Sequence, residues 1–192
     1  HSTSRRQRQM CIRDSSYADC ITKYGNAYQL NKALEDGLVF KFEDGIYSDS
    51  EYESEVAIIS KKYPDGIFTG VFAFYVHGFT DLIPDKYALA TKAKAAALVD
   101  SRVEQIYTRD DLLDMGVTQM EVGGTTISIY DKERMLIELL RNKNKMQKDL
   151  YKEIISNYRR IIDSLEIWRI QEYLDIFPKS KMIKKAFDEE IL

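Results

Sequence analysis

The chain has 192 residues, of which 44% are hydrophobic and 31% charged, so it is long enough for one ordinary core and a small satellite module. Its longest apolar stretches, such as residues 66–76, are broken by polar residues far short of the roughly 20 that span a bilayer, which excludes a membrane-spanning segment. The formal net charge of −3 excludes a uniformly basic chain, so any role with nucleic acid must rest on local patches.

The first fifteen residues require separate treatment. Residues Arg5 to Ser15 read RRQRQMCIRDS, which matches one reading frame of a common sequencing-library adapter. We interpret residues 1–15 as a non-native or disordered leader and expect the native sequence to continue upstream of Ser16. Without the adapter residues the chain has 24 basic and 30 acidic residues, a net charge of −6. The alternative is a native basic arm that contacts phosphates.

The two cysteines, Cys11 and Cys20, lie close together near the N-terminus. A disulfide between them would close only a short loop and would hold nothing in the body of the protein. This pattern is typical of a reduced, cytoplasmic protein.

Residues 16–50 have the pattern of a small head built as helix, turn, helix and hairpin. Ser16 and Asn26 can cap two short helices that are separated by Gly25. An Asp-Gly pair favours a tight turn between two β-prone runs. This order is that of a winged helix-turn-helix. In this chain, however, no first helix precedes Ser16. The predicted elements are helices at 16–24 and 26–36 and strands at 38–42 and 45–47.

The second helix of this head carries the candidate DNA-binding residues. Gln29, Asn31 and Lys32 lie near its N-terminal half, where a helix-turn-helix reaches base edges or phosphates in the major groove. Lys41 on the hairpin is placed to contact the DNA backbone. Because acidic residues lie close by, a head that binds protein instead of DNA is an equally physical reading.

Residues 51–192 form the predicted second domain. A helix at 55–62 and a buried helix within 70–79 precede four strands, at 87–91, 103–107, 120–122 and 125–130, and the chain is helical from residue 131 onward. The predicted fold class is therefore α+β: a winged-helix-like head, then a domain with a mainly antiparallel sheet and a C-terminal helical bundle.

The residues offer no catalytic, metal or cofactor site. His77 has no nucleophile context, so we interpret it as a packed, hydrogen-bonded structural histidine. Acid pairs such as Glu133 with Glu138, or Asp149 with Glu153, are expected on a solvated helix face. Neither a P-loop nor a dinucleotide-binding glycine fingerprint is present. We therefore predict that the protein is not an enzyme and requires no cofactor.

A cluster of basic residues near the junction of two C-terminal helices is a candidate secondary surface. It consists of Arg141, Lys143, Lys145 and Lys148, followed by Lys152, with Asn142 and Asn144 between them. Such a cluster can contact phosphates or an acidic partner. The alternative is a well-solvated polar loop between helices.

Short sequence blocks, taken in their order along the chain, resemble the AbiEi family. These are the antitoxins and transcriptional regulators of abortive-infection, type IV toxin–antitoxin operons. The blocks that carry the resemblance are Tyr24-Gly25, Tyr28-Gln29-Leu30, Gly45-Ile46-Tyr47, Lys62-Tyr63-Pro64, Phe74-Tyr75-Val76-His77-Gly78, Ile83-Pro84-Asp85-Lys86-Tyr87, the run from Tyr130 to Glu138, Asn157-Tyr158-Arg159 and Phe177-Pro178-Lys179-Ser180.

The resemblance implies a winged-helix head that binds operator DNA and represses its own operon. It also implies a C-terminal domain that opposes a nucleotidyltransferase-like toxin, without a stable complex between the two proteins. The alternative function is a protein-interaction module with a vestigial winged helix that no longer binds DNA. A metal-dependent nuclease or transferase built on the scattered carboxylates is a third hypothesis, with no residue spacing to support it.

Overall fold

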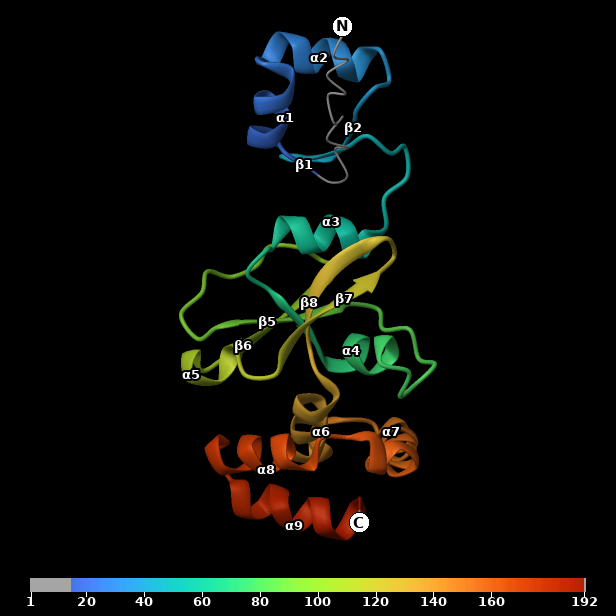
Figure 1. The fold of residues 1–192 in the computed structure, drawn as a ribbon, viewed down its shortest axis with the longest axis vertical. Helices are drawn as coiled ribbons and strands as arrows, with labels where there is room; N and C mark the ends of the chain where they lie inside the picture. The colour runs from blue at the N-terminus through green and yellow to red at the C-terminus, as the bar shows by residue number, and fades with distance from the viewer. Residues whose placement is uncertain (1–14, 192) are drawn as a thin grey trace, which may run out of the picture. The chain divides into compact units, whose positions relative to one another are not determined.

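The computed structural model describes residues 15–191, which form two compact units (Figure 1). The N-terminal unit comprises the residues up to Pro64 together with Gly123–Thr125. The C-terminal unit comprises Asp65–Val122 and the residues from Thr126 onward. Of the adapter-like segment, residues 5–14 lie outside the described residues.

The head of the N-terminal unit has the predicted order of helix, turn, helix and hairpin. Ser16 caps α1 through a capping box with Asp19, and Gly25 ends that helix. Asn26 caps α2 by accepting a hydrogen bond from the Gln29 amide at 2.9 Å. The elements are β1 (Ser15–Ser16), α1 (Tyr17–Tyr24), α2 (Ala27–Glu35), β2 (Phe40–Glu43) and β3 (Ile46–Ser48).

A three-stranded antiparallel sheet completes the head. Its order is β1-β3-β2, so the short strand before α1 pairs with the second strand of the hairpin. The helices pack through a small cluster of buried side chains, Cys20, Leu30, Ala33, Val39 and Tyr47. The helix pair followed by a hairpin is the predicted winged-helix order without its first helix, and Ser15 of β1 belongs to the adapter-like segment.

The N-terminal unit continues beyond the predicted domain boundary near Ser50. Ser54 caps α3 (Glu55–Lys62), which packs against β3. Lys62 at the end of α3 pairs with Glu43 of β2 at 2.9 Å. This helix is therefore part of the same compact unit as the head.

The C-terminal unit contains a five-stranded sheet with the order β6-β5-β4-β8-β7. Strand β4 is antiparallel to β5 and parallel to β8, while β5 and β6 are parallel. Antiparallel pairs predominate over the two sheets, and the predicted α+β class is confirmed. The strands are β4 (Ile67–Thr69), β5 (Tyr87–Lys92), β6 (Val103–Thr108), β7 (Val117–Val122) and β8 (Thr125–Tyr130).

The central strand β4 is, with β1 and the short helix α5 (Asp110–Leu113), one of the elements that the sequence pattern does not predict. It has three residues, too few to show a period, and lies directly before the predicted helix. Gly70 connects β4 to α4 (Gly70–Val76) with a φ of 63°, and a Cβ there would lie 2.9 Å from the Ala88 Cβ of β5. Glycine is required both by this conformation and by the close approach.

Helices complete the C-terminal unit, and α6 is its most deeply buried helix. Asp131 caps it, and seven of its ten residues are buried. Both α8 and α9 pack against α6. Figure 1 shows α6 to α9 gathered at the C-terminal end of the chain. The helices are α5 (Asp110–Leu113), α6 (Lys132–Arg141), α7 (Lys148–Ile161), α8 (Ile167–Ile176) and α9 (Ser180–Glu190), with short 3₁₀ turns at Lys143–Lys145 and Ile162–Ser164.

Candidate functional site

Helix α2 presents a polar face to solvent. Its apolar face is buried through Leu30 and Ala33, while the predicted DNA-binding residues Gln29, Asn31 and Lys32 are exposed. Their side chains make no hydrogen bond or ion pair with another residue of the described chain. All three side chains are therefore free to contact a partner: Gln29 and Lys32 lie on the same side of α2, and Asn31 points roughly 160° away from Gln29, since each residue turns the helix by about 100°.

Tyr28 belongs to the same part of the helix; the expectation from the sequence that it lies on the apolar face with Leu30 and Ala33 is wrong. Its side chain is 74% exposed, which is unusual for so large a ring and adds an aromatic contact to the polar face. The sequence carried a signal for its exposure: the buried residues Leu30 and Ala33 are spaced i, i+3, and Tyr28 lies outside that spacing, next to Gln29.

Lys41 lies on β2 beside the hairpin turn, as predicted, but its charge is compensated. Its Nζ donates a hydrogen bond to the Asp44 carboxylate at 2.6 Å, and both side chains are exposed. This contact raises the pKa of Lys41 and lowers that of Asp44. A phosphate bound at the hairpin would have to compete with Asp44 for this lysine.

The electrostatics of the head are unfavourable for unspecific attraction to DNA. Residues 16–50 contain three lysines, no arginine and six acidic residues. A basic footprint of several phosphate contacts supplies most of the affinity in ordinary DNA-binding domains. Recognition by this head would instead depend on hydrogen bonds from the amides of Gln29 and Asn31.

No protein-family model and no curated protein matches this chain. The residues and their geometry therefore carry the functional argument for the rest of the molecule. The C-terminal unit contains two further groups of polar residues, the titratable residues around His77 and the basic surface.

His77 is held in place by the main chain. Its Nε2 donates a hydrogen bond to the carbonyl oxygen of Tyr130 at 2.7 Å. Burial lowers the pKa of His77 below its ordinary value, which favours the neutral ring. The predicted hydrogen bond of this histidine is confirmed.

The expectation that Glu133 lies on a solvated face is wrong. Glu133 is buried and accepts a hydrogen bond from the Glu166 amide at 3.0 Å, because α6 is packed on most of its sides. Glu138 is half-buried and accepts a hydrogen bond from Arg134 at 2.9 Å. Within residues 15–191, no group of three or more His, Cys, Asp and Glu side chains is placed to hold a metal ion.

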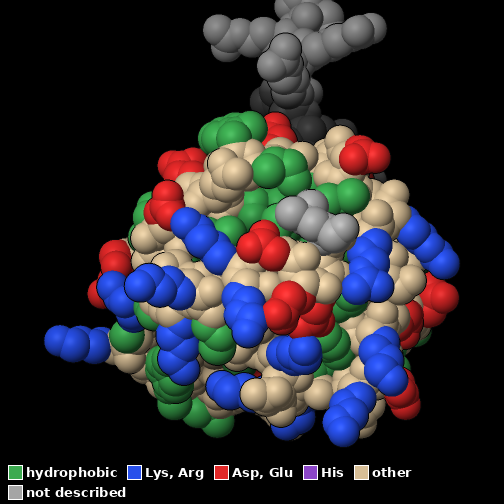
Figure 2. All heavy atoms as spheres, turned by 90° about the horizontal axis from the view of Figure 1, so that it is seen from below, with side chains coloured by type: hydrophobic (Ala, Val, Ile, Leu, Met, Phe, Trp, Pro, Cys, Tyr) green, Lys and Arg blue, Asp and Glu red, His purple; other side chains and the backbone are tan. Residues whose placement is uncertain are grey.

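The C-terminal helices carry the basic residues. Residues 16–140 contain 12 Lys and Arg and 21 Asp and Glu, whereas residues 141–192 contain 12 and 9. Figure 2 shows Lys and Arg side chains spread over the face that these helices form. The chain thus has a marked asymmetry of charge that its net value conceals.

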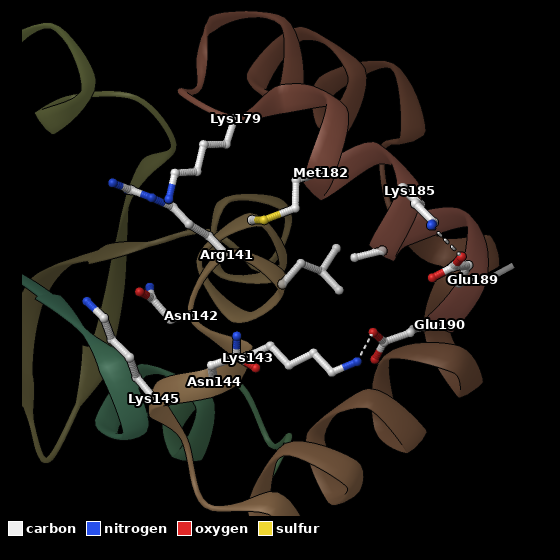
Figure 3. Close-up of a pocket in the computed structure, with 12 residues that line it drawn as sticks. Arg141, Asn142, Lys143, Asn144, Lys145, Lys179, Met182, Lys185, Glu189 and Glu190 are labelled. Atoms are coloured by element: carbon white, nitrogen blue, oxygen red, sulfur yellow. Dashed lines mark hydrogen bonds and ion pairs between the residues drawn. The ribbon is translucent and has the colours of Figure 1, made fainter.

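Part of this basic face is hollowed into a groove of about 410 Å³ (Figure 3). Three predicted residues of the secondary surface, Arg141, Lys143 and Lys145, line it, while Lys148 at the start of α7 does not. Two further lysines join them from distant sequence, and no sequence spacing indicated this. The lining comprises residues 140–145 together with Lys179, Met182, Lys185, Ala186, Glu189 and Glu190.

Proposed function

We propose that this protein is a DNA-binding autorepressor and antitoxin of a type IV toxin–antitoxin operon, acting in the cytoplasm. The observation that carries the DNA-binding part is the free polar face of α2 in a head with winged-helix topology. In that topology, the second helix of the pair enters the major groove with its N-terminal residues toward the base edges.

The partner class follows from the side chains on that face. Gln29 and Asn31 carry amides that can bond adenine in the major groove, and Lys32 can contact a phosphate or guanine. Operator DNA upstream of its own gene is the target that an autorepressor requires. Among the described residues, no helix is both long and apolar enough to cross a membrane.

The antitoxin part rests on the resemblance of the sequence blocks to the AbiEi family. In this proposal the C-terminal unit opposes a nucleotidyltransferase-like toxin without forming a stable complex with it. The resemblance extends over both units, since the blocks run from Tyr24-Gly25 to Phe177-Pro178.

A second candidate function is a protein-interaction module whose head no longer binds DNA. The acidic balance of residues 16–50 and the pairing of Lys41 with Asp44 favour it. This alternative predicts no sequence-selective binding of DNA by the head at any salt concentration.

Charge reversal at Lys32 tests the proposed function. Lys32→Glu is expected to weaken binding to a duplex from the upstream region of its own gene by on the order of tenfold, because a phosphate contact becomes a repulsion. Fluorescence anisotropy of the labelled duplex measures this affinity. Lys86→Glu, an exposed site in the C-terminal unit, makes the same change in net charge and is the matched control. Equal affinities of the Lys32→Glu and Lys86→Glu variants would exclude α2 as the DNA-contacting helix.

A further inference from the structure

The groove between the segment 140–145 and α9 has two chemically different ends. At one end, Lys143 pairs with Glu190 at 2.6 Å and Lys185 approaches Glu189 of the same helix at 3.6 Å. Burial opposes the ionisation of Glu190, but hydrogen bonds from Lys143 and Tyr151 outweigh it and lower its pKa. The positive charges at this end are therefore compensated within the protein.

The other end of the groove is cationic and much less compensated. Figure 3 shows Arg141, Lys145 and Lys179 extending away from Glu189 and Glu190. Lys145 and Lys179 are exposed and form no ion pair with any other residue in the range 15–191, and Arg141 has only a long contact of 3.7 Å with Glu138. Three positive side chains that line one hollow without a carboxylate between them favour an anion with more than one charge.

The lining also indicates the class of anion. Protein-binding surfaces are enriched in aromatic residues and depleted in lysine, whereas this groove has several lysines, two asparagines and no aromatic side chain. Lysine and asparagine are common donors to phosphate oxygens. An aromatic-free lining also provides no platform on which a base could stack.

We propose that this groove binds a run of neighbouring phosphate groups, with Arg141, Lys145 and Lys179 as the residues that hold them. The phosphates belong either to the backbone of a nucleic acid or to a free polyphosphate chain, and both present the same chemistry to these three side chains. This site is independent of the head, because every residue that lines it belongs to the C-terminal unit.

The test uses the full chain and the double variant Lys145→Gln/Lys179→Gln. Two probes are titrated at two salt concentrations. The first is a labelled duplex of scrambled sequence, which contains no operator. The second is inorganic tripolyphosphate, whose binding is measured by calorimetry. The matched control is Lys94→Gln/Lys181→Gln, which removes the same charge from exposed positions of the C-terminal unit outside the groove and outside the predicted basic cluster. Lys179 has a φ of 66°, so Lys145→Gln alone serves as a second variant that leaves this backbone position unchanged.

The double variant is expected to bind at least one probe on the order of tenfold more weakly than the control does. For the duplex, the slope of log affinity against log salt should fall by about 1 for each lysine removed. Loss of duplex binding alone assigns the phosphates to nucleic acid, and loss of tripolyphosphate binding alone assigns them to a free chain. The proposal is overturned if the wild-type chain binds neither probe, or if the groove variants and the control bind both equally. Since neither probe contains an operator, such a failure would leave operator recognition by the head untouched.

Discussion

Replacement of Arg134 by alanine is expected to lower the free energy of unfolding of the C-terminal unit by roughly 3–5 kcal/mol. The guanidinium is fully buried in α6 and donates hydrogen bonds to the carbonyl oxygens of Leu112 at 2.8 Å and Met115 at 3.3 Å. It also pairs with Glu138 at 2.9 Å. Its removal would leave two carbonyls and a half-buried carboxylate without this donor.

Aromatic rings add to the expected effect at this position. The guanidinium carbon of Arg134 lies 4.5 Å from the ring centroid of Tyr130 and 4.2 Å from that of Phe177. Both ring contacts are lost in the alanine variant, together with the volume that fills the space between them. Gly116 packs directly against this residue: a side chain at position 116 would collide with Arg134, because its Cβ would lie 2.6 Å from the Arg134 Cβ.

Urea unfolding tests this prediction. The transition is monitored by far-UV circular dichroism and by the fluorescence of Trp168, the single tryptophan, which lies in α8. Arg141→Ala is the control. A guanidinium nitrogen of Arg141 lies 3.7 Å from the Glu138 carboxylate, and its guanidinium carbon lies 5.9 Å from the ring centroid of Phe177, but the side chain is exposed. We expect it to cost about 0–1 kcal/mol. Equal unfolding midpoints for the two variants would contradict the role assigned to Arg134.

Leu30→Ala is expected to destabilise the head by roughly 2–5 kcal/mol. Leu30 is 1% exposed and belongs to a small cluster that, within residues 15–191, has five buried members, with Ile21, Tyr24 and Leu34 packed against them. Because a core of this size provides little excess stability, the variant head should be largely unfolded. It should then lose binding to operator DNA as well.

Hydrogen exchange read by mass spectrometry distinguishes the two units in this variant. Peptides from α1 and α2 should lose protection, while peptides from α6 should keep it, since they belong to the other compact unit. Leu38→Ala is the control, because Leu38 lies in the same head but is 61% exposed, so we expect a change within about 0.5 kcal/mol. Wild-type protection of α1 and α2 in Leu30→Ala would show that this cluster does not hold the head together.

Local signals in the sequence predict most of the secondary structure. Ser16, Asn26 and Asp131 accept the capping hydrogen bonds at the starts of α1, α2 and α6. Asp131 was not identified as a cap from the sequence, although the start of its helix was. Apolar periodicity indicated the longer helices α3, α7, α8 and α9 because each has a buried stripe, whereas the four-residue helix α5 is too short to show one. Strand β4 was not predicted, because three residues are too few to show an apolar period.

The parts that could not be predicted depend on tertiary contacts. Lys179 and Lys185 meet the segment 140–145 only because α9 packs against α6. The burial of Arg134 was not inferred either, because a single charge in a helix is ordinarily solvated. Its flanking run of Met135, Leu136 and Ile137 was the available signal, since a helix that is apolar on most sides must bury and pair any charge within it.

The central claim is that the head recognises operator DNA, and one titration tests it most directly. The full chain is titrated by gel shift against a duplex from the region upstream of its own gene and against a scrambled duplex of the same composition, at two salt concentrations. We predict that the upstream duplex binds tighter by a factor on the order of 10³ or more, and that higher salt weakens the binding. Equal affinity for the two duplexes, or no shift of the upstream duplex at either salt concentration, would contradict operator recognition and favour the protein-interaction module.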